Sequence, residues 1–446
     1  MKKIFLLVMA AAGLYSCQND DVATTDSSFA MKASGADYNV CSPALLDTIV
    51  SGDLTAANGP HVWTKDRVWT IRGVLRVKGT TLKIDPGTFI KADPTLTTGA
   101  NGVLVITKDA QINAVGTPTE PIVFTSWKLL DCNAANSPAP GDFGGVVLLG
   151  NAPVNTGSVT NIIEGLGDQP NPEDFYFGGS TPGHDAGSLQ YVRIEYGGRK
   201  LTPDVEINGL TFGGVGNAGL NVNTTKIHHI QVTYGTDDSY EWFGGTVNAR
   251  NLVSFAPEDD NFDFDWGYAG SINYALALAD RNSTHSLSGG NPDSNGIELD
   301  NDAAGSGNTP FTRPIINHLS VIGVSSTDAG SYENGIHVRR NGRITLLNST
   351  VAGYGVVATP NRYAINIESP SLAANSSFTN VGVNSYRTSP FTFPSSITNV
   401  TEAAGTNFGM GQPFFNAGTL NFVGATNGAF VDGTAWIDSW TKFNNF

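Results

Sequence analysis

Aspartate residues recur at nearly equal intervals through the central third of this 446-residue sequence. Asp238 and Asp260 are 22 positions apart, Asp260 and Asp280 are 20 apart, and Asp280 and Asp302 are 22 apart. If one coil of a repeating β-structure fills each interval, these carboxylates stack about 4.8 Å apart, the spacing of adjacent strands. Such a column of like charges is unfavourable unless a bound cation, shared protons with raised pKa values or neighbouring arginines compensate it.

Calcium is the cation that this pattern suits best, because Ca²⁺ takes about 6–8 oxygen ligands. The predicted ligands are seven aspartates of the central region: Asp237, Asp238, Asp259, Asp260, Asp263, Asp300 and Asp302. No EF-hand loop is present, and few histidines and cysteines remain for a zinc site. The competing interpretation is that these acids are solvated turn residues, for which aspartate is favoured. The sequence leaves both interpretations open.

The same region also holds the residue types that polysaccharide cleavage requires. Glycoside hydrolysis needs two carboxylates beside the glycosidic bond, and lyase chemistry needs a base near a cation. The candidate catalytic residues for this alternative are Asp238, Asp260, Glu298 and His337.

Aromatic residues alternate with the acids in this region. In the run from Phe262 to Trp266, strict alternation places the aromatic side chains on one face of a strand and the acids on the other. One interpretation places the aromatic rings in the core, as in a half-buried strand. The other uses Trp242 and Trp266 as exposed platforms on which a sugar ring stacks.

The elements that would position these residues are short β-strands. Apolar, β-branched runs are separated by Gly, Asn and Asp, and no segment shows a sustained helical period. The runs recur every 20 to 25 residues, at Ile230, Leu252, Ile272, Ile297, Leu319, Ile344 and Ile365. One coil of a parallel β-helix, with three strands and three turns, needs an interval of this length. The sequence therefore predicts an all-β solenoid.

The predicted solenoid occupies residues 71–404, and both of its ends must be blocked. We expect residues 37–70 to form an N-terminal cap and the aromatic-rich residues 405–446 to form a C-terminal cap. Gly-, Pro- and Asp-rich stretches between the strands are expected to be inserted loops, which in solenoids often line a binding surface.

The N-terminus predicts export and lipid anchoring. Residues 1–16 contain two lysines and a short apolar run, which is typical of a signal peptide and too short to span a bilayer. The sequence from Leu14 to Cys17 resembles a lipobox, in which Cys17 is acylated and becomes the first residue. Residues 17–36 are expected to form a flexible tether.

The two remaining cysteines, Cys41 and Cys132, suggest one disulfide in an oxidising compartment, although two buried free thiols would also fit. Acidic residues outnumber basic ones by 40 to 25, giving a net charge of −15. A nucleic-acid-binding protein needs a basic surface, so this class is excluded.

Several motifs resemble a large group of Bacteroidota surface lipoproteins: LKIDPGTFIKAD, GDFGGVVLLGNAPVN, YVRIEYGG, EINGLTFGGVG, YGTDDSYEWFGGTVNA, EDDNFDFDWGYAG and GIELDNDAAGS. The acidic residues after Cys17 are likewise similar to the export tag of that group. The resemblance implies a right-handed parallel β-helix of the pectate-lyase-like kind, on the outer face of the outer membrane. It supplies no catalytic residue. We therefore expect a surface protein that binds a glycan or an envelope protein, with a polysaccharide-degrading enzyme as the alternative.

Overall fold

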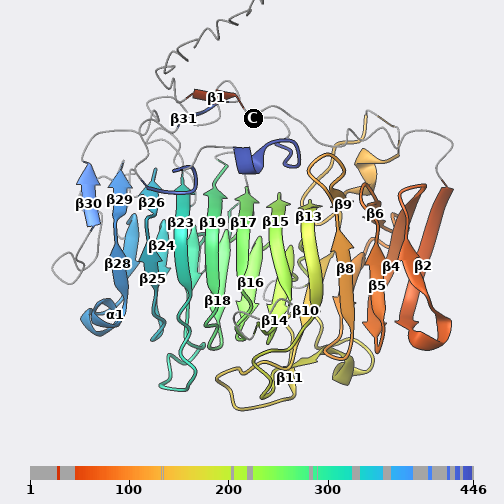
Figure 1. Cartoon of the computed structure of the whole chain (residues 1–446), viewed down its shortest axis with the longest axis horizontal. Coiled ribbons are helices and arrows are strands. Elements are labelled where there is room, and N and C mark those ends of the chain that lie inside the picture. The colour runs from red at the N-terminus through yellow and green to blue at the C-terminus, as the bar shows by residue number, and fades with distance from the viewer. Residues whose placement is uncertain are drawn as a thin grey trace, which may run out of the picture.

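A computed structural model describes most of the chain between residues 46 and 443. The described residues are 28–30, 46–131, 133, 135–201, 205–217, 225–280, 285–288, 290–323, 332–354, 363–384, 400–403, 419–421, 427–431 and 435–443. Twenty-five strands form one continuous sheet whose strand pairings are all parallel. Figure 1 shows the coils stacked along the long axis, from the N-terminal coils on the right to the C-terminal coils on the left. The chain is a right-handed parallel β-helix.

Each coil contributes strands to three faces of the solenoid. The first face contains β3 (His61–Trp63), β5 (Thr81–Ile84), β8 (Gln111–Val115), β25 (Thr345–Leu347) and β28 (Ser377–Thr379). The second contains β6 (Phe89–Ala92), β9 (Ile122–Thr125), β26 (Thr350–Ala352), β29 (Val381–Asn384) and β30 (Val400–Ala403). The third contains β7 (Val103–Ile106), β10 (Gly145–Leu149), β14 (Leu210–Gly213), β16 (Tyr240–Phe243), β18 (Phe262–Asp265), β22 (Ile297–Leu299), β24 (Ile336–Val338) and β27 (Ile365–Ile367).

Seven longer strands bend from one face into the next. β2 (Leu46–Thr55) and β4 (Arg67–Lys78) join the second face to the third. The first and second faces are joined by β13 (Gly187–Glu195), β15 (Lys226–Thr233), β17 (Ala249–Phe255), β19 (Ser271–Leu278) and β23 (Ile315–Ile322). Small elements lie outside the sheet: β1 (Ser28–Ala30), β11 (Asn161–Ile162), β12 (Tyr176–Phe177), β20 (Leu287–Ser288), β21 (Asn291–Pro292), β31 (Thr419–Asn421), α1 (Pro370–Asn375) and the 3₁₀ turns η2 (Ala56–Asn58), η3 (Trp127–Leu129), η4 (Pro172–Phe175) and η6 (Ala435–Ile437).

The bend between the first two faces needs a left-handed backbone at one residue of each strand. This residue is Asn251 in β17, with φ of 56°, and asparagine adopts this conformation readily. In β13 and β15 it is Tyr191 and His229, whose rings stack with centroids 4.4 Å apart. Ring stacking offsets the backbone cost of placing large residues at this corner.

A ladder of side chains holds the turn that leads from the second face to the third. The backbone N–H of Asp260 donates to Oδ1 of Asp238 over 2.8 Å, and that of Asn295 donates to Oδ1 of Asp260. The N–H of Asn334 donates to Oδ1 of Asn295, and the N–H of Tyr363 donates to Oδ1 of Asn334, each over 3.0 Å. Aspartate and asparagine therefore serve equally as acceptors in this ladder, but only aspartate adds a charge.

The predicted column of aspartates continues only as far as Asp260. The next position of the ladder is Asn295, 35 residues further on, because this coil contains an insertion with the β20–β21 hairpin. Asp280 lies inside the lengthened coil. Asp302 lies in the turn after β22, where Oδ1 accepts backbone N–H groups of Ala304 and Ser306 over 3.1 and 2.9 Å. The extrapolation to Asp280 and Asp302 was wrong because coil length is not constant.

Parts of the two predicted caps lie among the described residues. The segment 37–70 already contains β2 and β3, so the parallel sheet begins at Leu46. The described parts of 405–446 include residues 427–431 and 435–443, which we call the C-terminal segment. This segment packs on the outer side of the second face: Gly428 N–H donates to Asn348 O over 2.7 Å, and Gln231 and Lys442 exchange hydrogen bonds of 2.7 and 2.8 Å. Its buried aromatic residues cover Phe255 and Leu278.

Two predictions concern cysteines outside the described residues: the acylation of Cys17 and the pairing of Cys41 with Cys132. Within the described ranges, no helix has the length and apolar character needed to cross a bilayer.

Candidate functional site

A cavity of about 370 Å³ lies on the turn between the second and third faces. Eight carboxylates line it: Glu164, Glu206, Asp237, Asp238, Glu241, Asp259, Asp263 and Asp293. Among its lining residues Lys200 is the one cation, and it forms an ion pair with Glu206. We call this space the acidic cavity, since its carboxylates far outnumber the compensating charges.

The strands of the third face place part of this lining. Trp242 in β16 and Phe264 in β18 point into the solenoid, so the residues just before them, Glu241 and Asp263, point outward. Glu241 pairs with Asp263 and Asp263 with Glu298 in register across three neighbouring strands. The result is a row of carboxylates one strand spacing apart.

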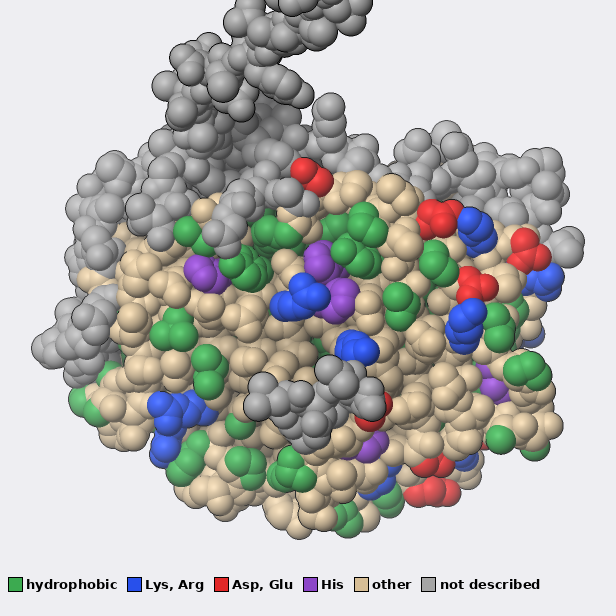
Figure 2. Space-filling view, in the orientation of Figure 1, with side chains coloured by type: hydrophobic (Ala, Val, Ile, Leu, Met, Phe, Trp, Pro, Cys, Tyr) green, Lys and Arg blue, Asp and Glu red, His purple; other side chains and the backbone are tan. Residues whose placement is uncertain are grey.

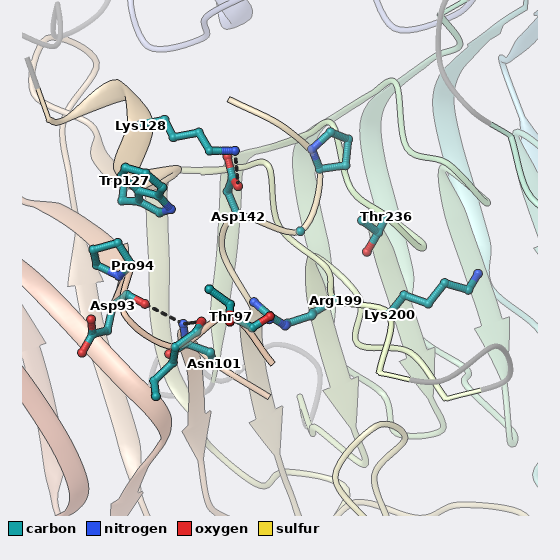
Figure 3. Close-up of a pocket in the computed structure, with 13 residues that line it drawn as sticks. Asp93, Pro94, Thr97, Asn101, Trp127, Lys128, Asp142, Arg199, Lys200 and Thr236 are labelled. Carbon is teal, nitrogen blue, oxygen red and sulfur yellow. Dashed lines mark hydrogen bonds and ion pairs between the residues drawn. The ribbon is translucent and has the colours of Figure 1, made fainter. Parts of the chain in front are cut away.

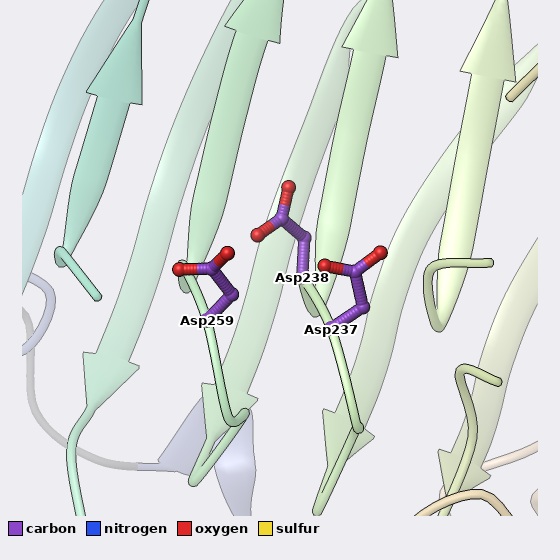
Figure 4. Close-up of side chains that lie close together, drawn as sticks. All are labelled: Asp237, Asp238 and Asp259. Carbon is purple, nitrogen blue, oxygen red and sulfur yellow. The ribbon is translucent and has the colours of Figure 1, made fainter. Parts of the chain in front are cut away.

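Asp237, Asp238 and Asp259 come from two consecutive turns, just before β16 and β18 (Figure 4). One carboxylate oxygen from each of the three lies within 4.8 Å of the others. Two further groups meet the same criterion, one of Asp238 with Glu241 and Asp263, the other of Asp263 with Asp260 and Glu298. Oxygens at this separation can share one Ca²⁺ ion, whose ligand distances are about 2.3–2.6 Å.

Burial makes these carboxyl groups hard to ionise. Asp238 is 6% exposed and Asp260 is 3% exposed. Burial, followed by repulsion from neighbouring carboxylates, holds the pKa of each well above its ordinary value. Burial and the Asp293 charge raise the pKa of Asp259 to about 7. Burial and the Glu206 charge raise the pKa of Glu164 to about 7 as well. Much of the Glu164 side chain is exposed, however, so the raised pKa of Asp259 is the better evidence for the effect of burial.

Two buried oxygen atoms of the site have no hydrogen-bond partner, Oδ1 of Asp263 and Oδ1 of Asn208. Asn208 lines the acidic cavity, is 1% exposed and donates its amide N–H to Glu241. A buried acceptor without a donor costs about 1–3 kcal/mol, so both atoms suit a cation that accepts electron density from oxygen.

The C-terminal end of the acidic row is compensated differently. Arg339 forms an ion pair with Glu298, and its Nε lies 3.0 Å from Oδ1 of Asp300. Arg340 Nη1 lies 2.8 Å from Oδ2 of the same Asp300. Arginine therefore neutralises Asp300, while the carboxylates around Asp238 lack such a partner within the described ranges.

The face of the solenoid shown in Figure 2 has a different charge. Histidine and basic side chains gather near its middle, and carboxylates are sparse there. Lys226, His228 and Arg250 belong to the first-face parts of β15 and β17. The middle of this face therefore differs in charge from the acidic cavity.

The structure brings together five of the seven predicted metal ligands: Asp237, Asp238, Asp259, Asp260 and Asp263. Asp300 forms ion pairs with Arg339 and Arg340, and Asp302 accepts hydrogen bonds within the turn after β22. Neither residue belongs to these carboxylate groups. Glu164, Glu206 and Asp293 were not predicted as ligands. They come from separate loops, and no regular spacing connects them to the aspartates.

Of the alternative catalytic residues, Asp260 and Glu298 belong to one carboxylate group, and Asp238 lies in the neighbouring groups. His337 pairs with Glu298 in register across β22 and β24. Its Nδ1 lies 3.3 Å from Glu333 Oε2, and its Nε2 lies 3.7 Å from Glu368 Oε1. The four residues therefore lie in two neighbouring rows: Asp238 and Asp260 belong to the ladder of the turn, and Glu298 and His337 are register partners on the third face.

Of the two predicted aromatic platforms, Trp242 lies in the core of the solenoid. Trp242 is fully buried, and its ring stacks between Phe212 and Phe264 at centroid distances of 5.3 and 4.8 Å. The prediction for Trp242 was wrong because its position in β16 points into the core. Trp266 is partly buried and packs against Phe177, with centroids 5.6 Å apart.

The family model of the pectate-lyase-like β-helix domain matches residues 55–441. Among curated proteins and solved structures, none matches this chain. Since the family model spans most of the sequence and the strands form a continuous parallel sheet, the chain belongs to the family of pectate-lyase-like β-helix domains.

Proposed function

We propose that this protein is a cell-surface binding protein whose β-helix holds a divalent cation, Ca²⁺, in the acidic cavity. The observation that carries the proposal is the group of buried carboxylates around Asp238, together with the unpartnered oxygens of Asp263 and Asn208. A cation would neutralise the carboxylates and give both oxygens a partner. The β-helix would then present a rigid surface to a glycan or an envelope protein.

The chemistry of the lining favours calcium over other metals. Its residues offer oxygen ligands and include neither histidine nor cysteine, which zinc and copper prefer. Magnesium demands a small octahedral shell and usually keeps several waters, so a dedicated cage of carboxylates suits it less well. Calcium accepts many carboxylates in irregular geometry.

Thermal unfolding of the full chain tests the proposal. We expect Ca²⁺ added after chelation to raise the melting temperature in proportion to the logarithm of its concentration, with about 2.7 kcal/mol of stabilisation at 100 times Kd. Asp238→Asn should abolish this rise. Asparagine keeps the ladder hydrogen bond to the N–H of Asp260, as Asn295 does in a later coil, so the substitution removes charge without removing the turn.

Asp302→Asn is the matched control, because asparagine also accepts hydrogen bonds in such turns and Asp302 lies outside the carboxylate groups. This variant should keep the full response to calcium. A wild-type protein that shows no shift with calcium, while Asp238→Asn is more stable than wild type in chelator, would contradict the proposal. The acidic cavity would then be held by shared protons.

The proposed location rests on the N-terminal sequence. Acyl chains on Cys17 would hold the protein at the outer membrane, with the solenoid at the cell surface. Cells that produce the Cys17→Ala variant should no longer incorporate labelled palmitate into the protein, whereas the Cys41→Ala variant should still be labelled. Equal labelling of the Cys17→Ala variant and the wild type would rule out the anchor.

A further inference from the structure

A second cavity, of about 420 Å³, lies beside the acidic cavity on the same side of the solenoid. It is formed by the segments that follow β6, β9, β13 and β15 as the chain turns from the second face to the third. Figure 3 shows Trp127 on one side of this cavity and Arg199 near its centre. Lys200 lines both cavities, so the two are neighbours.

Hydrogen bonds fix the wall that carries Trp127. This residue begins η3, where Ser126 Oγ accepts the N–H of Lys128 and itself donates to Asp142 Oδ2 over 2.6 Å. Lys128 Nζ lies 2.9 Å from Asp142 Oδ1, which neutralises that carboxylate. The Trp127 side chain stays partly exposed. The cavity thus has a preformed aromatic wall whose neighbouring charges are already paired.

Arg199 forms no direct ion pair within the described residues, although Asp142 lies near enough to attract it. Its Nη2 donates to the backbone oxygen of Thr97 over 2.8 Å, and within the described ranges no carboxylate lies within ion-pair distance of it. The other charged groups of the lining are compensated: Asp93 by Arg72, Asp142 by Lys128, and Lys200 by Glu206. The cavity therefore carries an excess of one positive charge in a protein of net charge −15.

We propose that this cavity binds one sugar residue that bears a single oxyanion, with the sugar ring against Trp127 and the oxyanion on Arg199. The planar guanidinium offers several N–H donors in a fixed geometry that matches an oxyanion. The indole face offers the apolar surface on which the C–H face of a ring packs. Carboxylated and sulfated sugars share this chemistry, and the experiment distinguishes them.

Isothermal titration of the full chain with glucuronate, N-acetylglucosamine 6-sulfate, glucose and inorganic sulfate tests the proposal. We expect at least one of the two charged sugars to bind at least tenfold more tightly than glucose, and the tighter one identifies the oxyanion. Arg199→Gln should weaken its binding at least tenfold, which equals about 1.4 kcal/mol. Trp127→Ala should weaken the binding of the same sugar and leave the affinity for inorganic sulfate unchanged.

Arg313→Gln is the matched control, since Arg313 is exposed and lies outside both cavities. It should bind the sugars as the wild type does. Equal affinity for glucose and both charged sugars, or binding that Arg199→Gln leaves intact, would overturn the proposal. The titrations are performed in chelator and again in Ca²⁺, so failure here is distinguishable from failure of the calcium proposal.

Discussion

The Arg339→Met variant is expected to be about 3–5 kcal/mol less stable than the wild type in chelator, the usual cost of removing one partner of a buried ion pair. Arg339 is 17% exposed at its side chain and is paired with both Glu298 and Asp300, which are themselves buried. Methionine keeps the apolar volume of the side chain but leaves the carboxylates of Glu298 and Asp300 without their shared cation. Asp263 also loses the attraction of the Arg339 guanidinium. Urea unfolding monitored by circular dichroism measures the difference.

The neighbouring arginine provides the control. Arg340 is 44% exposed, and its one ion pair among the described residues is with Asp300, so Arg340→Met should cost less than about 1 kcal/mol. Equal losses for the two variants would show that Arg339 acts only as a surface charge. The row of carboxylates would then not depend on a buried guanidinium for its compensation.

In chelator, the protein should become more stable as the pH falls from 8 to about 5. The folded-state pKa of Asp259 is about 7 and that of Asp265 is about 8, both raised first of all by burial. In the unfolded chain these groups titrate near 4. Between about pH 4 and pH 7 to 8 the folded state binds more protons than the unfolded state, so protonation stabilises the folded state. This stabilisation is lost as the pH rises through 7 and 8. Each such proton contributes about 1.4 kcal/mol per pH unit.

Calcium should reverse this pH dependence. An ion bound by ionised carboxylates competes with protons, so its stabilising effect should be larger at pH 8 than at pH 5. Melting temperatures measured across this range, with and without Ca²⁺, test both statements. Asp238→Asn removes one of the coupled carboxyl groups and should flatten the curve in chelator. Stability that falls steadily from pH 8 to pH 6 in chelator would show that these groups are not buried as described.

The sequence was sufficient to predict the solenoid, because short apolar runs separated by Gly, Asn and Asp are what its strands and turns require. The predicted interval of 20 to 25 residues holds for Ile230 and Leu252, which are register partners, but one later coil takes 44 residues, from Ile272 to Ile316. The gathering of Asp237, Asp238, Asp259 and Asp260 could also be predicted, since equivalent positions of two coils of equal length lie on neighbouring turns. The extension to Asp302 failed where the 35-residue coil broke the regular spacing. The sequence spacing of residues predicts contacts between coils only where no loop is inserted and the coils have equal length.

The rest of the acidic cavity could not be derived in this way. Glu164 and Glu206 come from loops whose path is set by packing on β11, β12 and their neighbours, and no periodicity encodes that path. Trp242 illustrates a second difficulty. Alternation shows that aromatic and acidic residues occupy opposite sides of β16. It does not show which of the two sides faces the core, and in the structure the side with Trp242 does.

The C-terminal segment changes how the solenoid is expected to come apart. A stack held only by contacts between adjacent coils frays from its ends, one coil at a time. Here the chain folds back, and its hydrogen bonds at Asn348 and Gln231 attach it to coils several steps apart in the stack. The coils between these two attachment points cannot unfold one at a time until the C-terminal segment detaches. Unfolding of this part of the solenoid is therefore expected to be cooperative instead of gradual.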